Sequence, residues 1–202
     1  MRASTRRELV AGPAGGIECA IDAPDNPHAV ALIAHPHPLF GGTLDNKVVQ
    51  TLARSLVELG YAAVRPNFRG VGATEGVHDE GRGELEDLAA VLAWAQGQFG
   101  RAPPVLAGFS FGSFVQTHLA QRVTPERMVL VGVAVKRFDA LPVPANSLVI
   151  HGEIDETVLL ADVLDWARPQ QLPVVVVPGA DHFFHQKLHI LRAIVQSNWR
   201  GR

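Results

Sequence analysis

The sequence has one cysteine, a net charge of only −2 and no long apolar run. Cys19 cannot form an intramolecular disulfide, and its segment GIECAI predicts a small buried side chain. Lys and Arg total 18 against 20 Asp and Glu, and the basic residues are scattered, which argues against nucleic acid as a partner. No run approaches the roughly 18 apolar residues of a membrane span, and none follows the basic N-terminus as in a secretory signal. A cytoplasmic location is therefore expected.

The length and composition indicate an ordinary globular chain. With 202 residues, of which 47% are hydrophobic, the chain is long enough for a full core. A domain of this size buries roughly 70% of the surface that its unfolded chain exposes. The chain contains no repeat, no low-complexity tract and no linker long enough to divide it. We therefore expect a single domain over residues 1–202.

Predicted strands and helices alternate along the chain. Short continuous apolar runs are typical of strands covered on both faces, and apolar residues spaced by three or four are typical of helices. RRELVAG and GIECAID predict a first hairpin, and further strands are expected at 28–34, 61–68, 104–109, 127–135, 146–152 and 173–179. Helices are expected at 47–60, 85–99, 111–121, 155–168 and 184–195. This alternation predicts an α/β fold with a mostly parallel central sheet and helices on both faces.

Chemistry-bearing residues follow several of the predicted strands. The carboxyl ends of parallel strands are where the active sites of open α/β sheets gather. Ser110 follows the strand PVLAGF, Asp155 follows NSLVI in HGEIDE, and His182 follows PVVVVPG in ADHFFH. A serine, an acid and a histidine thus fall at three strand ends, in that order along the chain.

This order and these positions resemble the α/β-hydrolase fold. The segments HPHPLFGGTLDNKVVQTLARSL, RPNFRGVGATEG, GFSFGS, HGEIDE and PGADHFF look like those of small serine hydrolases related to dienelactone hydrolases and carboxylesterases, over nearly the whole chain. Dienelactone hydrolases use a cysteine nucleophile, whereas this chain has Ser110, so their lactone specificity does not carry over. Only KRFDALPVPA is available where many hydrolases insert a lid, which predicts a minimal cap or none and an open, shallow site.

GFSFG satisfies the G-x-S-x-G motif of the resemblance, in which a sharp strand-to-helix turn exposes the serine hydroxyl. Its glycines are needed because the bend leaves no room for a Cβ. A serine requires a base, and the base requires an orienting acid. The resemblance assigns these roles to His182 and Asp155. The rival bases are His118, His151, His185 and His189, and the rival acids are Glu153 and Asp181.

The negative charge of an acyl-transfer intermediate needs N–H donors. One is expected from the backbone of Phe111, directly after the nucleophile, and the second from HPHPLFGG. Pro36 and Pro38 have no N–H, which leaves His37, Leu39 and Phe40. Loops of the dienelactone-hydrolase type have their donor just before an aromatic-glycine pair, and by that resemblance Leu39 is the expected donor.

The remaining motifs do not predict a cofactor. RGVGATEG has Glu75 where a dinucleotide fingerprint requires its third glycine, and no helix is expected to begin there. His35 and His37 have no apparent partner ligands for a metal. No metal and no organic cofactor are therefore expected.

The sequence predicts a serine hydrolase that cleaves a small ester or thioester through Ser110, His182 and Asp155. A small-molecule acyl substrate is the expected partner. The same residues would also suit a peptidase or an acyltransferase, because the triad sets the reaction class and the surrounding pocket sets the substrate. A binding protein with a hydrolase fold is the alternative outside the enzymes, although such proteins normally lack a triad member.

Overall fold

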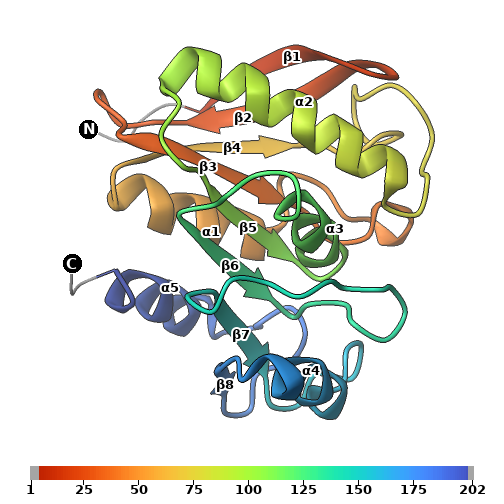
Figure 1. Ribbon diagram of the computed structural model, residues 1–202, viewed down its shortest axis with the longest axis vertical. Helices are drawn as coiled ribbons and strands as arrows, with labels where there is room; N and C mark the ends of the chain where they lie inside the picture. The colour runs from red at the N-terminus through yellow and green to blue at the C-terminus, as the bar shows by residue number, and fades with distance from the viewer. Residues whose placement is uncertain (1–4, 200–202) are drawn as a thin grey trace.

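One sheet of eight strands organises the protein, in the order β1-β2-β4-β3-β5-β6-β7-β8 (Figure 1). The structure is a computed structural model that describes residues 5–199. The strands are β1 (Arg6–Gly12), β2 (Gly15–Asp22), β3 (Ala29–Ala34), β4 (Tyr61–Pro66), β5 (Val105–Phe109), β6 (Arg127–Val131), β7 (Leu148–Gly152) and β8 (Val174–Val177). β1 pairs with β2 and β2 with β4 in antiparallel fashion, and all other neighbours are parallel. The predicted mostly parallel sheet is confirmed.

Helices cover both faces of this sheet (Figure 1). They are α1 (Lys47–Glu58), α2 (Arg82–Phe99), α3 (Phe111–Leu119), α4 (Leu160–Ala167) and α5 (Leu188–Ser197), with 3-10 turns η1 (Pro38–Phe40) and η2 (Arg168–Gln170). α1 and α5 pack on one face, and α2 and α3 on the other. β3 and β5 are buried along their whole length because both of their faces are covered, which explains their continuous apolar runs.

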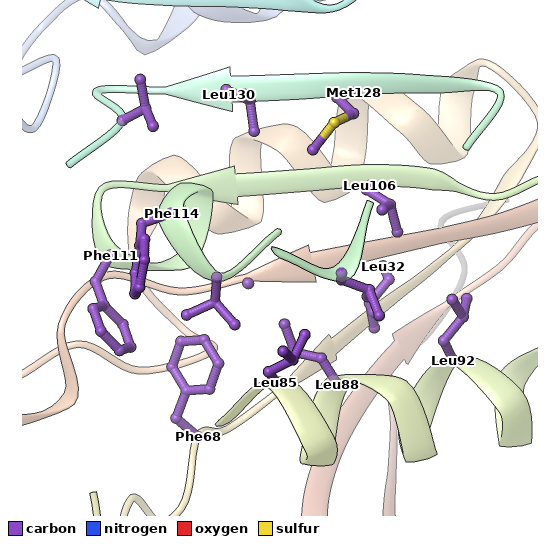
Figure 2. Close-up of a cluster of buried hydrophobic side chains, with 14 of the residues drawn as sticks. Leu32, Phe68, Leu85, Leu88, Leu92, Leu106, Phe111, Phe114, Met128 and Leu130 are labelled. Atoms are coloured by element: carbon purple, nitrogen blue, oxygen red, sulfur yellow. The ribbon is translucent and has the colours of Figure 1, made fainter. Parts of the chain in front are cut away.

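The core is divided by the sheet into two clusters of buried side chains. Figure 2 shows part of the cluster on the α2 and α3 side, where Phe68 and Phe111 lie close to each other. Their rings meet edge to face, with centroids 5.4 Å apart. Phe111 is the first residue of α3 and is fully buried, so its ring anchors the start of that helix in the core.

Several elements end or begin at places that the apolar pattern did not predict. α4 begins at Leu160 instead of residue 155. β6 ends at Val131 instead of continuing to residue 135, because Gly132 has a φ of 52° and turns the chain out of the sheet. α5 begins at Leu188 instead of residue 184. Phe184 and Gln186 have φ values of 54° and 60°, which a helix cannot accommodate, although Phe184 is fully buried.

The chain between β6 and β7 forms no lid. Residues 132–147 contain neither a helix nor a strand. The expectation of an uncapped site is therefore confirmed for this connection. Among residues 5–199, no helix is both long and apolar enough to cross a membrane.

Candidate active site

Ser110 occupies a strained turn between β5 and α3. Its φ of 54° and ψ of −116° are rare for a residue with a side chain. Its backbone N–H donates to the carbonyl of Val131 at 2.9 Å, and its carbonyl accepts from the N–H of Phe114 at 3.2 Å. Serine at a helix start normally caps the helix, but the Ser110 side chain makes no capping hydrogen bond. The Ser110 hydroxyl is therefore not used to cap α3.

The two motif glycines are required by close contacts with the backbone. A Cβ on Gly108 would lie 2.6 Å from the nitrogen of Ser113. A Cβ on Gly112 would lie 2.4 Å from the carbonyl oxygen of Ala34, at the end of β3. Both distances are far below van der Waals contact, so a side chain at either position would push α3 away from the sheet.

Gly112→Ala is expected to lower the free energy of unfolding by at least about 2 kcal/mol, because rigid backbone must move to admit the methyl group. Gly97→Ala is the matched control, since nothing lies within 4 Å of a Cβ at that position in α2. Alanine there is expected to raise stability by about 0.5–1 kcal/mol. Urea denaturation of both variants checks this, and equal effects would contradict the packing argument.

Asp155 and His182 form a buried pair. The Nδ1 atom of His182 lies 2.6 Å from the Oδ2 atom of Asp155, and the two residues are 5% and 4% exposed. The other carboxylate oxygen accepts hydrogen bonds from the N–H groups of Thr157 and Val158, at 2.9 and 2.8 Å. These bonds fix the carboxylate so that Oδ2 faces the imidazole.

The rival acids are engaged elsewhere. Asp181 contacts Nδ1 of His185 at 2.5 Å, and Glu153 accepts from the N–H of Gly179 at 2.7 Å. The structure thus brings His182 together with Asp155 rather than with either neighbour.

The rival histidines His118 and His151 also have local partners. His118 bonds the carbonyl of Asp139 at 2.8 Å, and the buried His151 bonds that of Val158 at 2.9 Å. Nε2 of His151 lies 3.6 Å from Oδ2 of Asp155. Burial lowers the pKa of His151, so this ring is neutral at pH 7 and supports the turn that carries Asp155.

Ser110 and His182 flank the same short segment after β6. The N–H of Ala134 donates to the carbonyl of Ser110 at 3.4 Å, while a Cβ on Gly132 would lie 3.2 Å from Cε1 of His182. The ring of Phe109, directly before Ser110, lies 4.8 Å from the ring of His182. Within residues 5–199 the Ser110 hydroxyl makes no hydrogen bond, to His182 or to another group. Catalytic hydrogen bonds are often long in free enzymes and tighten when substrate binds.

The β3–α1 loop lies against the start of α3. A Cβ on Gly112 would lie 2.5 Å from the carbonyl oxygen of His35, and the rings of His37 and Phe111 are 4.8 Å apart. The N–H of Leu39 donates to Nδ1 of His37 at 3.3 Å, and the N–H of Phe40 donates to the carbonyl of His37 at 3.1 Å. Within the described chain, the N–H groups of Phe111 and His37 have no hydrogen-bond partner.

A second histidine and acid lie beside this loop and were not predicted from the sequence. Nδ1 of His78 lies 2.8 Å from Oε1 of the fully buried Glu84, and the ring of His78 lies 4.8 Å from that of His37. Burial lowers the pKa of His37, and the neighbouring His78 and Arg137 act in the same direction. A neutral His37 can accept the N–H of Leu39. The sequence does contain one signal for the position of Glu84. Glu84 lies three residues after Gly81, the residue at which α2 is capped, and this is the position of the acid in a capping box.

His35 supports the loop from within the core. Its Nδ1 contacts the carbonyl of Pro36 at 2.6 Å, and its Nε2 accepts from the N–H of Phe68 at 2.9 Å. Burial lowers the pKa of His35 to about 4, against the opposing effect of the Pro36 carbonyl. The ring is therefore neutral in the folded protein.

Stability is expected to fall by about 2 kcal/mol between pH 7 and pH 5 on account of His35. The depressed pKa means that the unfolded chain binds more protons between about pH 6.5 and 4, so this stability is complete above that range and is lost as the pH falls through it. Urea denaturation at the two pH values measures the loss, and His28→Gln, at an exposed site, should not change it. NMR titration of the His35 ring above pH 5 would contradict the account.

Two cavities could be considered for a substrate. One of about 930 Å³ lies over α1 and is lined partly by Arg7, Arg65 and Arg192, which are paired with carboxylates. A smaller one of about 330 Å³ is lined partly by His182. Ser110 lines neither of the two, and His182 lines only the smaller one. In the part of the chain that the structure describes, no group of three or more His, Cys, Asp or Glu residues could hold a metal ion.

Comparison with known proteins identifies the family. The family model for the alpha/beta hydrolase fold matches residues 37–141. The chain belongs to the α/β-hydrolase family. An uncharacterized protein of Rickettsia prowazekii, RP471, is 35% identical over 193 residues, which cover 87% of this chain and 81% of that protein.

Solved α/β-hydrolase structures agree over nearly the whole chain. XC6422 from Xanthomonas campestris, described as an α/β serine hydrolase without a lid, has a TM-score of 0.92 and 37% identity, covering 99% of this chain and 95% of its own. An α/β serine hydrolase homologue from Coxiella burnetii has a TM-score of 0.89 and 39% identity, with 96% and 97% covered. The predicted α/β-hydrolase fold is thereby confirmed.

Proposed function

We propose that this α/β hydrolase transfers an acyl group from a small ester or thioester to water, with Ser110 as nucleophile, His182 as base and Asp155 as orienting acid. The observation that carries the proposal is the buried contact of 2.6 Å between His182 and Asp155, at the same sheet edge as a serine on a strained turn. A carboxylate next to Nδ1 of a histidine keeps the ring proton on Nδ1. The other ring nitrogen, Nε2, is then free to accept a proton.

The reaction proceeds in two steps. The oxygen of Ser110 attacks the carbonyl carbon while Nε2 of His182 takes the hydroxyl proton. Asp155 stabilises the imidazolium that forms, and His182 then passes the proton to the leaving alcohol or thiol. A water molecule repeats the sequence on the acyl-enzyme and releases the acid. His182 can act as the base only while its Nε2 carries no proton.

The developing oxyanion is stabilised by backbone N–H groups. The N–H of Phe111 is supported as the first donor because it starts α3 and has no partner among the described residues. For the second donor, Leu39 remains the expectation from the resemblance, but its N–H would first have to leave Nδ1 of His37. The N–H of His37 has no partner and is the competing donor in the same loop. Each donor contributes about 3–4 kcal/mol to transition-state stabilisation.

The experiment compares substrates with one acyl group and different leaving groups. We expect the wild type to hydrolyse p-nitrophenyl acetate and butyrate and a matched thioester, and to cleave the p-nitroanilide much more slowly. Ser110→Ala supplies the background rate. Preferential cleavage of the anilide would favour a peptidase. Failure of the folded wild type to cleave any of these compounds would contradict the proposal.

A further inference from the structure

The cavity next to His182 is built from two loops that do not supply the nucleophile. Its volume is about 330 Å³, and its lining residues are Ile154, Glu156, Thr157, Asp181, His182 and Phe183. The first three follow β7, and the last three follow β8. His182 is 95% buried and lines the cavity, and in the described chain its Nε2 has no hydrogen-bond partner.

The leaving group is the part of the substrate that reaches this cavity. In acyl transfer the base returns its proton to the departing oxygen or sulfur, so that atom must lie against His182. The β3–α1 loop, which holds the candidates for the second oxyanion donor, contributes no residue to the cavity lining. The groups around His182 therefore select among alcohols and thiols rather than among acyl chains.

The charge of this cavity is negative. Glu156 and Asp181 line it, and no Lys or Arg does. Within residues 5–199, Glu156 forms no ion pair. Burial raises the pKa of Asp181, but hydrogen bonds from the side chain and N–H of His185 outweigh it and hold the pKa below its usual value. The Asp181 carboxylate is therefore ionised at neutral pH.

An aromatic face accompanies the carboxylates. Phe183 is 45% exposed, and its ring meets that of His182 edge to face with centroids 5.2 Å apart. Ile154 adds a second exposed apolar side chain, 57% accessible. Carboxylates near an exposed aromatic ring and an aliphatic side chain form the kind of surface that attracts ammonium groups, because the ring face is electron-rich.

We propose that the cavity formed by Ile154, Glu156, Asp181 and Phe183 binds a cationic leaving group, so that preferred substrates are esters or thioesters of alcohols or thiols carrying an ammonium group. This inference rests on the proposed function, since it requires acyl transfer at Ser110. Anionic leaving groups are disfavoured by the same carboxylates.

The ammonium group takes no part in bond making. Attack by Ser110 forms the bond between its oxygen and the acyl carbon, and the bond from that carbon to the departing oxygen or sulfur breaks. The departing atom takes the proton that His182 had accepted from Ser110. Water then supplies a hydroxyl to the acyl carbon, the bond from that carbon to the Ser110 oxygen breaks, and the remaining proton of the water passes through His182 to that oxygen.

The test uses two thioesters with the same acetyl group. Acetylthiocholine has a quaternary ammonium, and 3,3-dimethylbutyl thioacetate has a carbon in its place. Each kcat/KM is divided by the rate of cleavage by hydroxide, which removes the difference in thiol acidity. At low ionic strength the normalised kcat/KM of the wild type is expected to be about tenfold higher for acetylthiocholine than for the neutral thioester. One exposed cation–π contact and one exposed charge pair together have an effect of this size. Added salt should reduce the preference.

Variants assign the preference to the cavity. Glu156→Gln and Phe183→Leu are each expected to lower the ratio about threefold, and Glu156→Lys should lower it below that of Glu156→Gln. Glu153→Gln is the matched control, because the Glu153 carboxylate bonds Gly179 outside the cavity, and it should leave the ratio unchanged.

Two results would overturn the inference in different ways. If the wild type hydrolyses both thioesters with a normalised ratio near one, or if Glu156→Lys retains the wild-type ratio, the cavity does not select cations and the proposed function stands. If the folded wild type hydrolyses neither thioester nor the p-nitrophenyl esters, the proposed function fails and the inference fails with it.

Discussion

Ser110→Ala is expected to lower kcat for ester hydrolysis by at least about 10⁴-fold, because no other group supplies the attacking oxygen. The backbone of the turn should be unchanged, since alanine keeps the Cβ, and the free energy of unfolding should stay within about 0.5 kcal/mol of wild type. Steady-state kinetics with p-nitrophenyl acetate measures the loss. Ser197→Ala, an exposed hydroxyl on α5, serves as the control and should retain wild-type activity.

Ser110→Gly separates the chemistry from the strain. It should be as inactive as Ser110→Ala, but glycine tolerates the φ of 54° that a side chain makes costly. We expect it to be more stable than Ser110→Ala by about 1 kcal/mol, at the lower end of the cost of such a conformation. Equal stability of the two variants would show that the turn stores no strain. Substantial activity in either variant would contradict the role of Ser110.

Asp155→Asn is expected to lower kcat by about 10³- to 10⁴-fold while the fold is retained. The N–H groups of Thr157 and Val158 bind one side-chain oxygen, so the amide oxygen would take that place and the amide NH₂ would face His182. An N–H donor there requires Nδ1 of His182 to be the acceptor. The proton then moves to Nε2, which can no longer accept the proton of Ser110.

Glu153, two residues before Asp155, supplies the comparison. Glu153→Gln should retain wild-type kcat on p-nitrophenyl acetate, because Glu153 bonds Gly179 and not His182. A small effect of Asp155→Asn, or an equally large effect of Glu153→Gln, would contradict the assignment of the acid. NMR of the His182 ring nitrogens would report the change of tautomer directly.

The fold could be predicted largely because its strands are buried on both faces. β3 and β5 are short, continuous and apolar, and helices with a clear apolar stripe separate them from the next strands. The predicted end of β6 and the predicted start of α5 are wrong because backbone conformation, rather than hydrophobicity, sets these two boundaries. Val133 and Phe184 are both fully buried outside any strand or helix, so the apolar pattern continues past Gly132 and begins before Leu188.

The residues of the candidate site could be located at the strand ends, but their contacts could not be predicted. Glu153, Asp155 and Asp181 all lie near the ends of β7 and β8, and only the hydrogen bonds of the folded chain separate their partners. The contact between His78 and Glu84 joins a loop to a helix start, so no strand-end argument reveals it. Likewise, the bond from Leu39 to His37 depends on the turn η1, which the sequence did not predict.

The most direct test of the central claim is the intact mass of the protein after exposure to a fluorophosphonate. Such reagents form a stable adduct only with a serine that a neighbouring base has activated. We expect one adduct on the wild type and none on folded Ser110→Ala. No adduct on the folded wild type, or an adduct that persists in Ser110→Ala, would contradict Ser110 as the activated nucleophile of this protein.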